Sequence, residues 1–390
     1  MIPFPKSEFD ARIAKVKAAM QKAGVDVLLS TDTANLNYLT GYDGWSFYTP
    51  QAVILALDAP EPIWTGRFMD SKGCEFTTYL KPDNVRGYPD IYVQTPERHA
   101  SSFMAEILKE KGWDKKRIGL EMDSFYFTPR AYEEFKRSLP NATWVNADLL
   151  VNWVRIVKSP AEINYMKQAA KIVEKIMGVA YDVIAPGVRE CDAVAKISEA
   201  QISGTKEFGG DYSAFVPLVM PEPKSAAPHL TWTDEPFQNN RGICLELSAA
   251  RYHYHSVLCR TVYLGKPKDE LVKLAEVCNV AIAEALDAIK PGLTCGEVHA
   301  AWNRVIAKHG YSKESRIGYS LGVNYPPDWG EHTASLRPGD KTVLQPNMTF
   351  HMVTGMWMTG WGYEVSESWR VTEKGAETLA VVPRDLHVKA

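Results

Sequence analysis

The stretch AEINYMKQAAKIVEKIMGVAYDVIAPGVRECDAVAKISEAQISG, residues 161–204, returns later in the chain as KDELVKLAEVCNVAIAEALDAIKPGLTCGEVHAAWNRVIAKHG, residues 268–310. Each copy has the apolar spacing of a long amphipathic helix, then a Pro-Gly turn, then a second helix. Pro186-Gly187 in the first copy aligns with Pro291-Gly292 in the second. Self-similarity of this kind is typical of a duplicated structural unit. The duplication decides the fold of this half of the chain.

Strand-like sequence follows both copies. It spans residues 212–220 and 243–265 after the first copy, and 342–353 and 363–373 after the second. Two α-α-β halves predict an α+β domain with a pseudo-twofold axis. We expect strands of both halves to form a curved sheet, with helices on its convex face and a ligand site on its concave face near the axis.

A domain boundary is predicted just before the first copy. Ser159 has the position of a helix N-cap, Pro160 that of the first helical residue, and Glu162 completes a capping box. The predicted domains are therefore residues 1–155 and 156–390.

The first domain is predicted to be α/β because helices and strands alternate along it. A helix from Ser7, apolar at Phe9, Ile13, Val16 and Met20, should end before Gly24. The expected strands are 25–30, 52–57, 117–121 and 142–147, and the expected further helices are 101–112 and 128–139.

Composition excludes several function classes. The 390 residues are 45% hydrophobic and 23% charged, and the net charge of −3 gives no basic surface of the size that binds nucleic acid. No stretch approaches 18 uninterrupted apolar residues, which predicts no membrane span. The first 20 residues show a helix pattern instead of a secretion signal. Six cysteines without CxxC spacing favour reduced thiols and a cytoplasmic protein, with Cys244 and Cys259 in the core.

Polar residues with catalytic potential fall on strands of both halves. Glu246 alternates with apolar neighbours in one strand, His351 lies in another, and Glu364 shares a strand face with Ser366 while Glu367 takes the opposite face. Taken singly, each of these residues would be interpreted as a solvent-facing or structural residue. The predicted fold would bring them together, and His229, in a loop before the Glu246 strand, would join them.

Five motifs carry a family resemblance: LNYLTGY (36–42), VRIVKSPAEINYMKQA (154–169), PHL (228–230), RTVYLG (260–265) and RVTEKGAETL (370–379). With the duplicated pattern, they resemble the pita-bread family of methionine aminopeptidase, aminopeptidase P, prolidase and creatinase. The resemblance implies a creatinase-like α/β N-terminal domain and a pita-bread catalytic domain. It also implies a homodimer in which the first domain of one subunit reaches the active site of the other.

This sequence differs from the family pattern at the positions of the metal ligands. The family's metallopeptidases bind two metals through two Asp, a His and two Glu, and the corresponding positions here are Glu246, Val257, Tyr319, His351 and Ser366. Because Val supplies no ligand and Tyr no comparable one, we expect no dinuclear centre and no other cofactor. A single metal held by Glu246, His229, His351 and a nearby Glu is the alternative.

A narrower resemblance rests on residues 317–340, 345–357 and YEVSES (363–368). These are similar to ectoine hydrolases, which open the cyclic amidine of ectoine to N-acetyl-L-2,4-diaminobutyrate. The resemblance implies a zwitterionic small-molecule substrate, with 5-hydroxyectoine as a second candidate, and a deacetylase that acts next as a further candidate partner.

The expected mechanism needs no metal. Glu246 would attack the amidinium carbon or activate water, and His229 would relay protons to the departing nitrogen. His351 and one of Glu364 or Glu367 would orient the ring; strand alternation favours Glu364, and the family alignment favours Glu367. A delocalised cation is also held well by aromatic faces. The candidates for that role are Trp45, Phe47, Tyr48, Tyr319, Tyr325, Trp329 and Trp357.

Three rival functions are kept. An X-Pro metallopeptidase with a rearranged site and a creatinase-like amidinohydrolase would both use the same fold. A pita-bread module that binds peptides or proteins without catalysis is the third, although it gives no chemical reason for His229 and Glu246.

Overall fold

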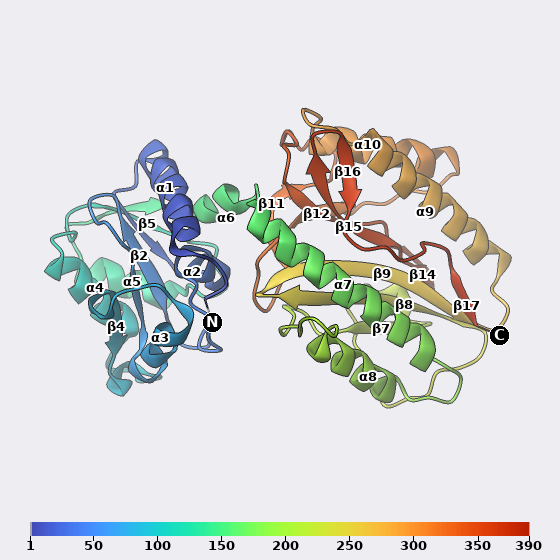
Figure 1. Ribbon diagram of the computed structural model, residues 1–390, viewed down its shortest axis with the longest axis horizontal. Helices are drawn as coiled ribbons and strands as arrows, with labels where there is room; N and C mark the ends of the chain where they lie inside the picture. The colour runs from blue at the N-terminus through green and yellow to red at the C-terminus, as the bar shows by residue number, and fades with distance from the viewer. Residues whose placement is uncertain (1, 390) are drawn as a thin grey trace. The chain divides into compact units, whose positions relative to one another are not determined.

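The computed structural model describes residues 2–389, and the chain divides into two compact units, Met1–Arg155 and Ile156–Ala390. In Figure 1 the first unit runs from blue to green-cyan and the second from green to red.

The first unit is an α/β domain around one mixed sheet with strand order β4-β3-β2-β1-β5-β6. β1 pairs parallel with β5 and antiparallel with β2. Its strands are β1 (Val27–Ser30), β2 (Ala52–Ala56), β3 (Ile63–Arg67), β4 (Val85–Tyr88), β5 (Arg117–Leu120) and β6 (Thr143–Asn146), and its helices are α1 (Lys6–Ala23), α2 (Thr33–Thr40), α3 (Gly73–Thr77), α4 (Ala100–Glu110), α5 (Pro129–Ser138) and α6 (Leu150–Arg155).

The expected α/β class is confirmed, with differences in detail. Helix α1 ends at Gly24, whose φ of 68° is the left-handed conformation that glycine adopts without strain. It begins one residue before Ser7, after Pro5, so Ser7 does not cap it. Strands β3 and β4 were not expected, because their short, glycine-containing sequences show no strict alternation.

The second unit contains the duplicated helix pairs. The first pair is α7 (Pro160–Val183) and α8 (Glu190–Ser203), and the second is α9 (Asp269–Ala288) and α10 (Cys295–Lys308). Ser159 and Glu162 form the expected capping box. Gly187 and Gly292 in the two turns have φ values of 83° and 92°, so both Pro-Gly turns use glycine's left-handed conformation.

The strands of the second unit form two main sheets and a small hairpin. The sheet orders are β17-β9-β8-β7 and β11-β10-β12-β15-β16, with β13 paired to β14. The strands are β7 (Leu218–Pro221), β8 (Arg241–Arg251), β9 (Tyr254–Leu264), β10 (Gly318–Leu321), β11 (Gly330–Ser335), β12 (Thr349–Val353), β13 (Met356–Met358), β14 (Trp361–Tyr363), β15 (Ser366–Thr372), β16 (Gly375–Thr378) and β17 (His387–Lys389).

Side-chain hydroxyls join the two sheets where a single curved sheet was expected. The Val257 and Cys259 backbone N–H groups in β9 donate to the hydroxyls of Ser368 and Ser366 in β15, at 2.8 and 2.6 Å. The Ser368 hydroxyl in turn donates to the Val257 carbonyl at 2.9 Å. Serine at these positions replaces backbone pairing at the seam, so the two halves meet along β9 and β15.

Helices cover the outer faces of both sheets. Helix α7 packs across β8 and β9 (Figure 1). Helices α9 and α10 share a buried core with β12 and β15, where Phe350 and Trp369 stack with ring centroids 4.8 Å apart. Across residues 2–389, none of the helices combines the length and apolar content that crossing a bilayer requires.

Candidate active site

Glu246 and Cys259 face each other across the β8–β9 hairpin. The register pairs these two residues directly, and directly opposite residues of an antiparallel pair point to the same face. In the other half of the unit, His351 in β12 is opposite both Tyr319 in β10 and Ser368 in β15. The pattern therefore brings one set of polar side chains from each half.

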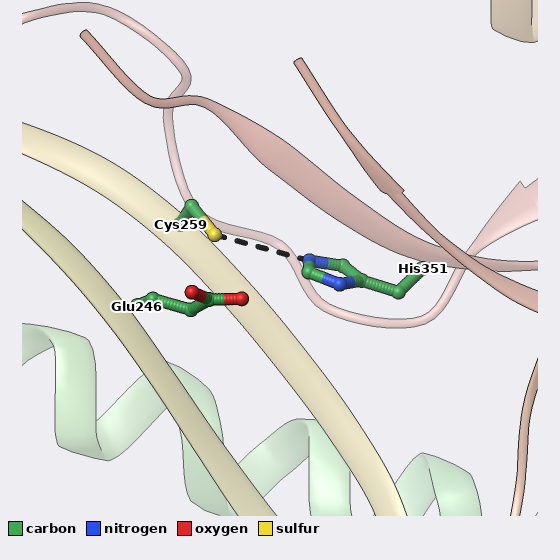
Figure 2. Close-up of side chains that lie close together, drawn as sticks. All are labelled: Glu246, Cys259 and His351. Carbon is green, nitrogen blue, oxygen red and sulfur yellow. Dashed lines mark hydrogen bonds between the residues drawn. The ribbon is translucent and has the colours of Figure 1, made fainter. Parts of the chain in front are cut away.

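These two sets meet in a buried cluster. Glu246, Cys259 and His351 each place one oxygen, sulfur or nitrogen atom within 4.8 Å of the other two. Figure 2 shows the Glu246 carboxylate, the Cys259 thiol and the His351 ring gathered around one point, with the thiol 3.9 Å from His351 Nε2. All three side chains are buried. We call this group the central cluster.

Hydrogen bonds hold both ring nitrogens of His351 in place. The Trp329 indole N–H, which can only donate, bonds to the Tyr319 hydroxyl at 2.7 Å, and that hydroxyl lies 3.1 Å from His351 Nδ1. On the other side of the ring, Nε2 lies 2.8 Å from the Ser366 hydroxyl, which accepts the Cys259 backbone N–H, so both ring nitrogens are hydrogen-bonded. Burial, with the charge of Arg316, lowers the pKa of His351 to about 3, so the ring is neutral near pH 7.

Two carboxyl groups, one in the central cluster and one beside it, have raised pKa values. Burial raises the pKa of Glu246 well above its usual range, and the nearby charges of Glu364 and Asp328 raise it further. Burial also raises the pKa of Glu364 to about 7, against the opposing effect of Lys313. Two buried carboxylates that repel each other are stabilised by a cation between them. This is the electrostatic condition for binding an amidinium group.

Lys313 adds a positive charge to the same region. Its ammonium group donates to the Gly355 carbonyl at 2.6 Å and lies 3.7 Å from the centre of the Trp357 ring. Burial lowers the pKa of Lys313 to about 8, against the charge of Glu364. Lys313 therefore still carries its proton at pH 7, beside a carboxyl group that titrates near that pH.

Glu246 and five further predicted residues belong to this region. Tyr319, Trp329, His351, Glu364 and Trp357 surround Glu246 through the bonds and charges above. The prediction is corrected for Glu367, which is on the opposite, helix-covered face. There its carboxylate is 2.9 Å from both Arg260 and Arg384, and these ion pairs stabilise the fold.

His229 lies outside the central cluster. It is exposed, in the loop after the short helix η4 (Lys224–Ala226), and it forms no hydrogen bond with any described residue. Helix η4 packs on β13 and β14, the hairpin that carries Trp357 and leads to Glu364. The loop of His229 thus begins at the wall of the site that contains Glu364.

The other predicted aromatic residues are spread over both units. Tyr325 is buried and stacks on His253, with ring centroids 4.1 Å apart, beside Tyr212. In the first unit, the ring of Phe47 packs against Trp45 and Tyr126. The side chains of Trp45 and Tyr48 are 59% and 61% exposed, so they are accessible to a ligand or a second subunit.

The donor atoms do not fit a dinuclear metal centre. Of the five ligand positions implied by the metallopeptidase resemblance, Val257 has no donor atom, and the hydroxyls of Tyr319 and Ser366 are bonded to His351. One carboxylate and one imidazole remain. Together with the Cys259 thiol they could hold one ion, as the three donor atoms of the central cluster lie within 4.8 Å.

Sequence reasoning missed Cys259, Lys313 and Arg316. Cys259 was expected in the core, and it is buried, but its position opposite Glu246 depends on the hairpin register. That register is set by a two-residue turn, Tyr252-His253, in which both residues have positive φ values of 49° and 61°. Such turns normally contain Asn-Gly or Asp-Gly, so neither residue gave a turn signal.

Comparison with known proteins gives a consistent result. Residues 12–157 match the Creatinase/Prolidase N-terminal domain, and residues 164–373 match Metallopeptidase family M24. The chain is similar to an ectoine hydrolase of Halomonas elongata, with 44% identity over 100% of this chain and 99% of the relative. It is also similar to an Xaa-Pro dipeptidase of Lactobacillus helveticus, with 24% identity over 96% and 98%. The solved prolidase of Thermococcus sibiricus has the same fold, with a TM-score of 0.85 and 22% identity over 98% and 99% of the two chains.

Proposed function

We propose that this chain, which belongs to Metallopeptidase family M24, opens the cyclic amidine ring of ectoine to N-acetyl-L-2,4-diaminobutyrate. The observation that carries the proposal is the buried pair Glu246 and Glu364, whose mutual repulsion favours a cation of the amidinium type. The likeness to the Halomonas elongata ectoine hydrolase supports the choice of substrate. The ring of 5-hydroxyectoine presents the same amidinium group and is a second candidate substrate.

The proposed chemistry begins at the carbon between the two ring nitrogens. The Glu246 carboxylate attacks this carbon or removes a proton from the water that does, and either route gives a tetrahedral centre. One ring nitrogen then accepts a proton and leaves as an amine, and the remaining C–N unit becomes the acetamide, whose oxygen comes from water. On the direct-attack route, water adds after the amine has left and cleaves the bond between Glu246 and this carbon, which restores the carboxylate. Glu364 stabilises the positive charge of the bound ring.

His351 is proposed to position groups instead of carrying protons. Its pKa of about 3 prevents it from accepting a proton near pH 7, and both ring nitrogens are already hydrogen-bonded. We therefore assign the proton relay to His229, whose exposed side chain can exchange protons with water. The wall on which the His229 loop begins carries Trp357 and leads to Glu364, which supports this assignment.

The experiment that tests the function uses chelator-treated protein. It is incubated separately with ectoine, creatine and an X-Pro dipeptide, and the products are followed by NMR. We expect ring opening of ectoine with full activity after chelation, because the site lacks ligands for two metals. Turnover of the dipeptide alone, or loss of all ectoine turnover until one metal is restored, would contradict the proposal.

A metal-dependent hydrolase is the second candidate function, favoured by one observation. Glu246, Cys259 and His351 lie close enough to hold a single ion. Metal analysis of the purified protein separates the two candidates, since this alternative requires about one ion per chain and its removal must abolish turnover.

We also propose a homodimer, as the family resemblance implies, in which the exposed Trp45 and Tyr48 approach the site of the second subunit. Aromatic side chains suit both an interface and a delocalised cation. Light scattering combined with an activity assay checks this, because a fully active monomer would contradict it.

The pH dependence of kcat/KM should have an acidic limb near pH 7. Glu364, with a pKa of about 7, takes up a proton as the pH falls, and the site then loses a negative charge that attracts the amidinium. We expect kcat/KM for ectoine to fall by up to about tenfold per pH unit below this point. The Glu364→Gln variant should move the limb to lower pH, because it removes the charge that raises the pKa of Glu246. A flat profile between pH 5.5 and 8 would exclude these carboxyl groups from the reaction.

A further inference from the structure

Two arginines converge on one hydroxyl group beside the central cluster. Arg316 Nη1 and Arg337 Nη2 both donate to Ser335 Oγ, at 3.1 and 3.0 Å. Within residues 2–389, neither guanidinium has a carboxylate within ion-pair distance. Arg316 is half-buried and Arg337 is exposed, and like charges held this close repel each other unless an anion lies between them.

Two other arginines of this unit behave differently. Arg260, which is fully buried, pairs with Glu367 and also donates to four backbone carbonyl groups. Arg370, which is half-buried, pairs with Glu377. Arg316 is half-buried like Arg370, yet its single hydrogen bond within the described chain goes to Ser335. Its guanidinium therefore retains donors for a carboxylate, which Arg binds in a bidentate manner.

Arg316 is also next to the reacting groups. Its guanidinium lies over the Tyr319 ring, 4.4 Å from the centre, and the hydroxyl of the same tyrosine bonds to His351. Asp328, whose charge also reaches Arg316, is already bonded to His332 at 2.6 Å and to the Gly330 N–H. One tyrosine ring therefore connects an unpaired cation with the cluster that contains Glu246.

We propose that Arg316 binds the carboxylate of the substrate, with Arg337 beside it, so that the site selects a cyclic amidine that carries a carboxyl group. This inference rests on the proposed function. The carboxylate pair Glu246 and Glu364 takes the amidinium end of the zwitterion, and the arginine pair takes its anionic end. An uncharged or purely cationic ring would leave Arg316 without a counter-ion.

The test combines a variant of the protein with a variant of the substrate. Arg316→Gln removes the charge and keeps hydrogen-bonding ability, and the decarboxylated ring, 2-methyl-1,4,5,6-tetrahydropyrimidine, removes the matching carboxylate. We expect Arg316→Gln to raise KM for ectoine by about 30- to 300-fold with a much smaller change in kcat, and to leave kcat/KM for the decarboxylated ring within about threefold of the wild type. Arg370→Gln is the matched control and should change neither substrate's kinetics.

The outcomes separate the inference from the proposed function. Equal losses on both substrates in Arg316→Gln would mean that Arg316 only supports Tyr319, and the inference would be overturned. Failure of the wild type to open ectoine would overturn the function and the inference with it. If Arg316→Gln does not fold, Arg316→Lys keeps the charge but not the bidentate geometry, and we then expect about a tenfold rise in KM for ectoine alone. An unchanged KM in that variant would also overturn the inference.

Discussion

Glu246→Gln is expected to lower kcat for ectoine by at least about a hundredfold. Glutamine keeps the shape of the side chain and can still bond to neighbours, but it can neither attack the amidinium carbon nor remove a proton from water. General-base catalysis contributes roughly 10² to 10⁴ in rate, and a covalent nucleophile can contribute more. Steady-state kinetics measures kcat, and KM should change less because Glu364 still attracts the cation.

Protein stability provides the control for this variant. Because burial raises the pKa of Glu246, the folded protein favours its protonated form, and this contribution to stability is lost as the pH rises through the raised pKa. Above the usual pKa of a glutamate, the wild type bears the cost of keeping this buried carboxyl group protonated or of ionising it, and the glutamine variant bears neither cost. We therefore expect a melting temperature equal to that of the wild type at pH 5 and a few degrees higher at pH 8. A variant that retains more than about a tenth of the wild-type kcat would favour the single-metal or binding-module functions.

His229→Ala is expected to have the second-largest effect, about a hundredfold loss in kcat. The departing nitrogen must gain a proton, and His351 cannot exchange one because its pKa is lowered to about 3. His229 is exposed, so its replacement should leave the melting temperature unchanged. His229→Gln, which keeps a polar side chain without the titrating ring, should be as inactive as the alanine variant.

The double variant Glu246→Gln/His229→Ala adds a stricter requirement. Two residues that serve one proton transfer show effects that are far from additive. We expect the double variant to be about as slow as Glu246→Gln alone. Near wild-type turnover in His229→Ala would instead point to Lys313, which is protonated at pH 7 and lies near Glu364, and Lys313→Met would then be the inactive variant.

The architecture could be derived from local sequence. Three local signals predicted it: the repeat at 161–204 and 268–310, the capping box at Ser159 and the two Pro-Gly turns. Each signal acts within one turn or one helix, so the structure that it predicts does not depend on distant residues. The alternation of β8 placed Glu246 on the strand face opposite its apolar neighbours, and the alternation expected over residues 363–368 separated Glu364 from Glu367. The sequence alone could not choose between the last two.

Only the tertiary structure decided which of these faces meet. Glu367 is removed from the site by its ion pairs with Arg260 and Arg384, and Cys259 enters it through a hairpin turn that carries no glycine. Arg316 reaches the site across the ring of Tyr319. Strand period and helix caps are properties of neighbouring residues. The bonds between β9 and β15 and the ion pair of Arg260 with Glu367 join segments 107 to 111 residues apart, so they exist only once the two halves have packed.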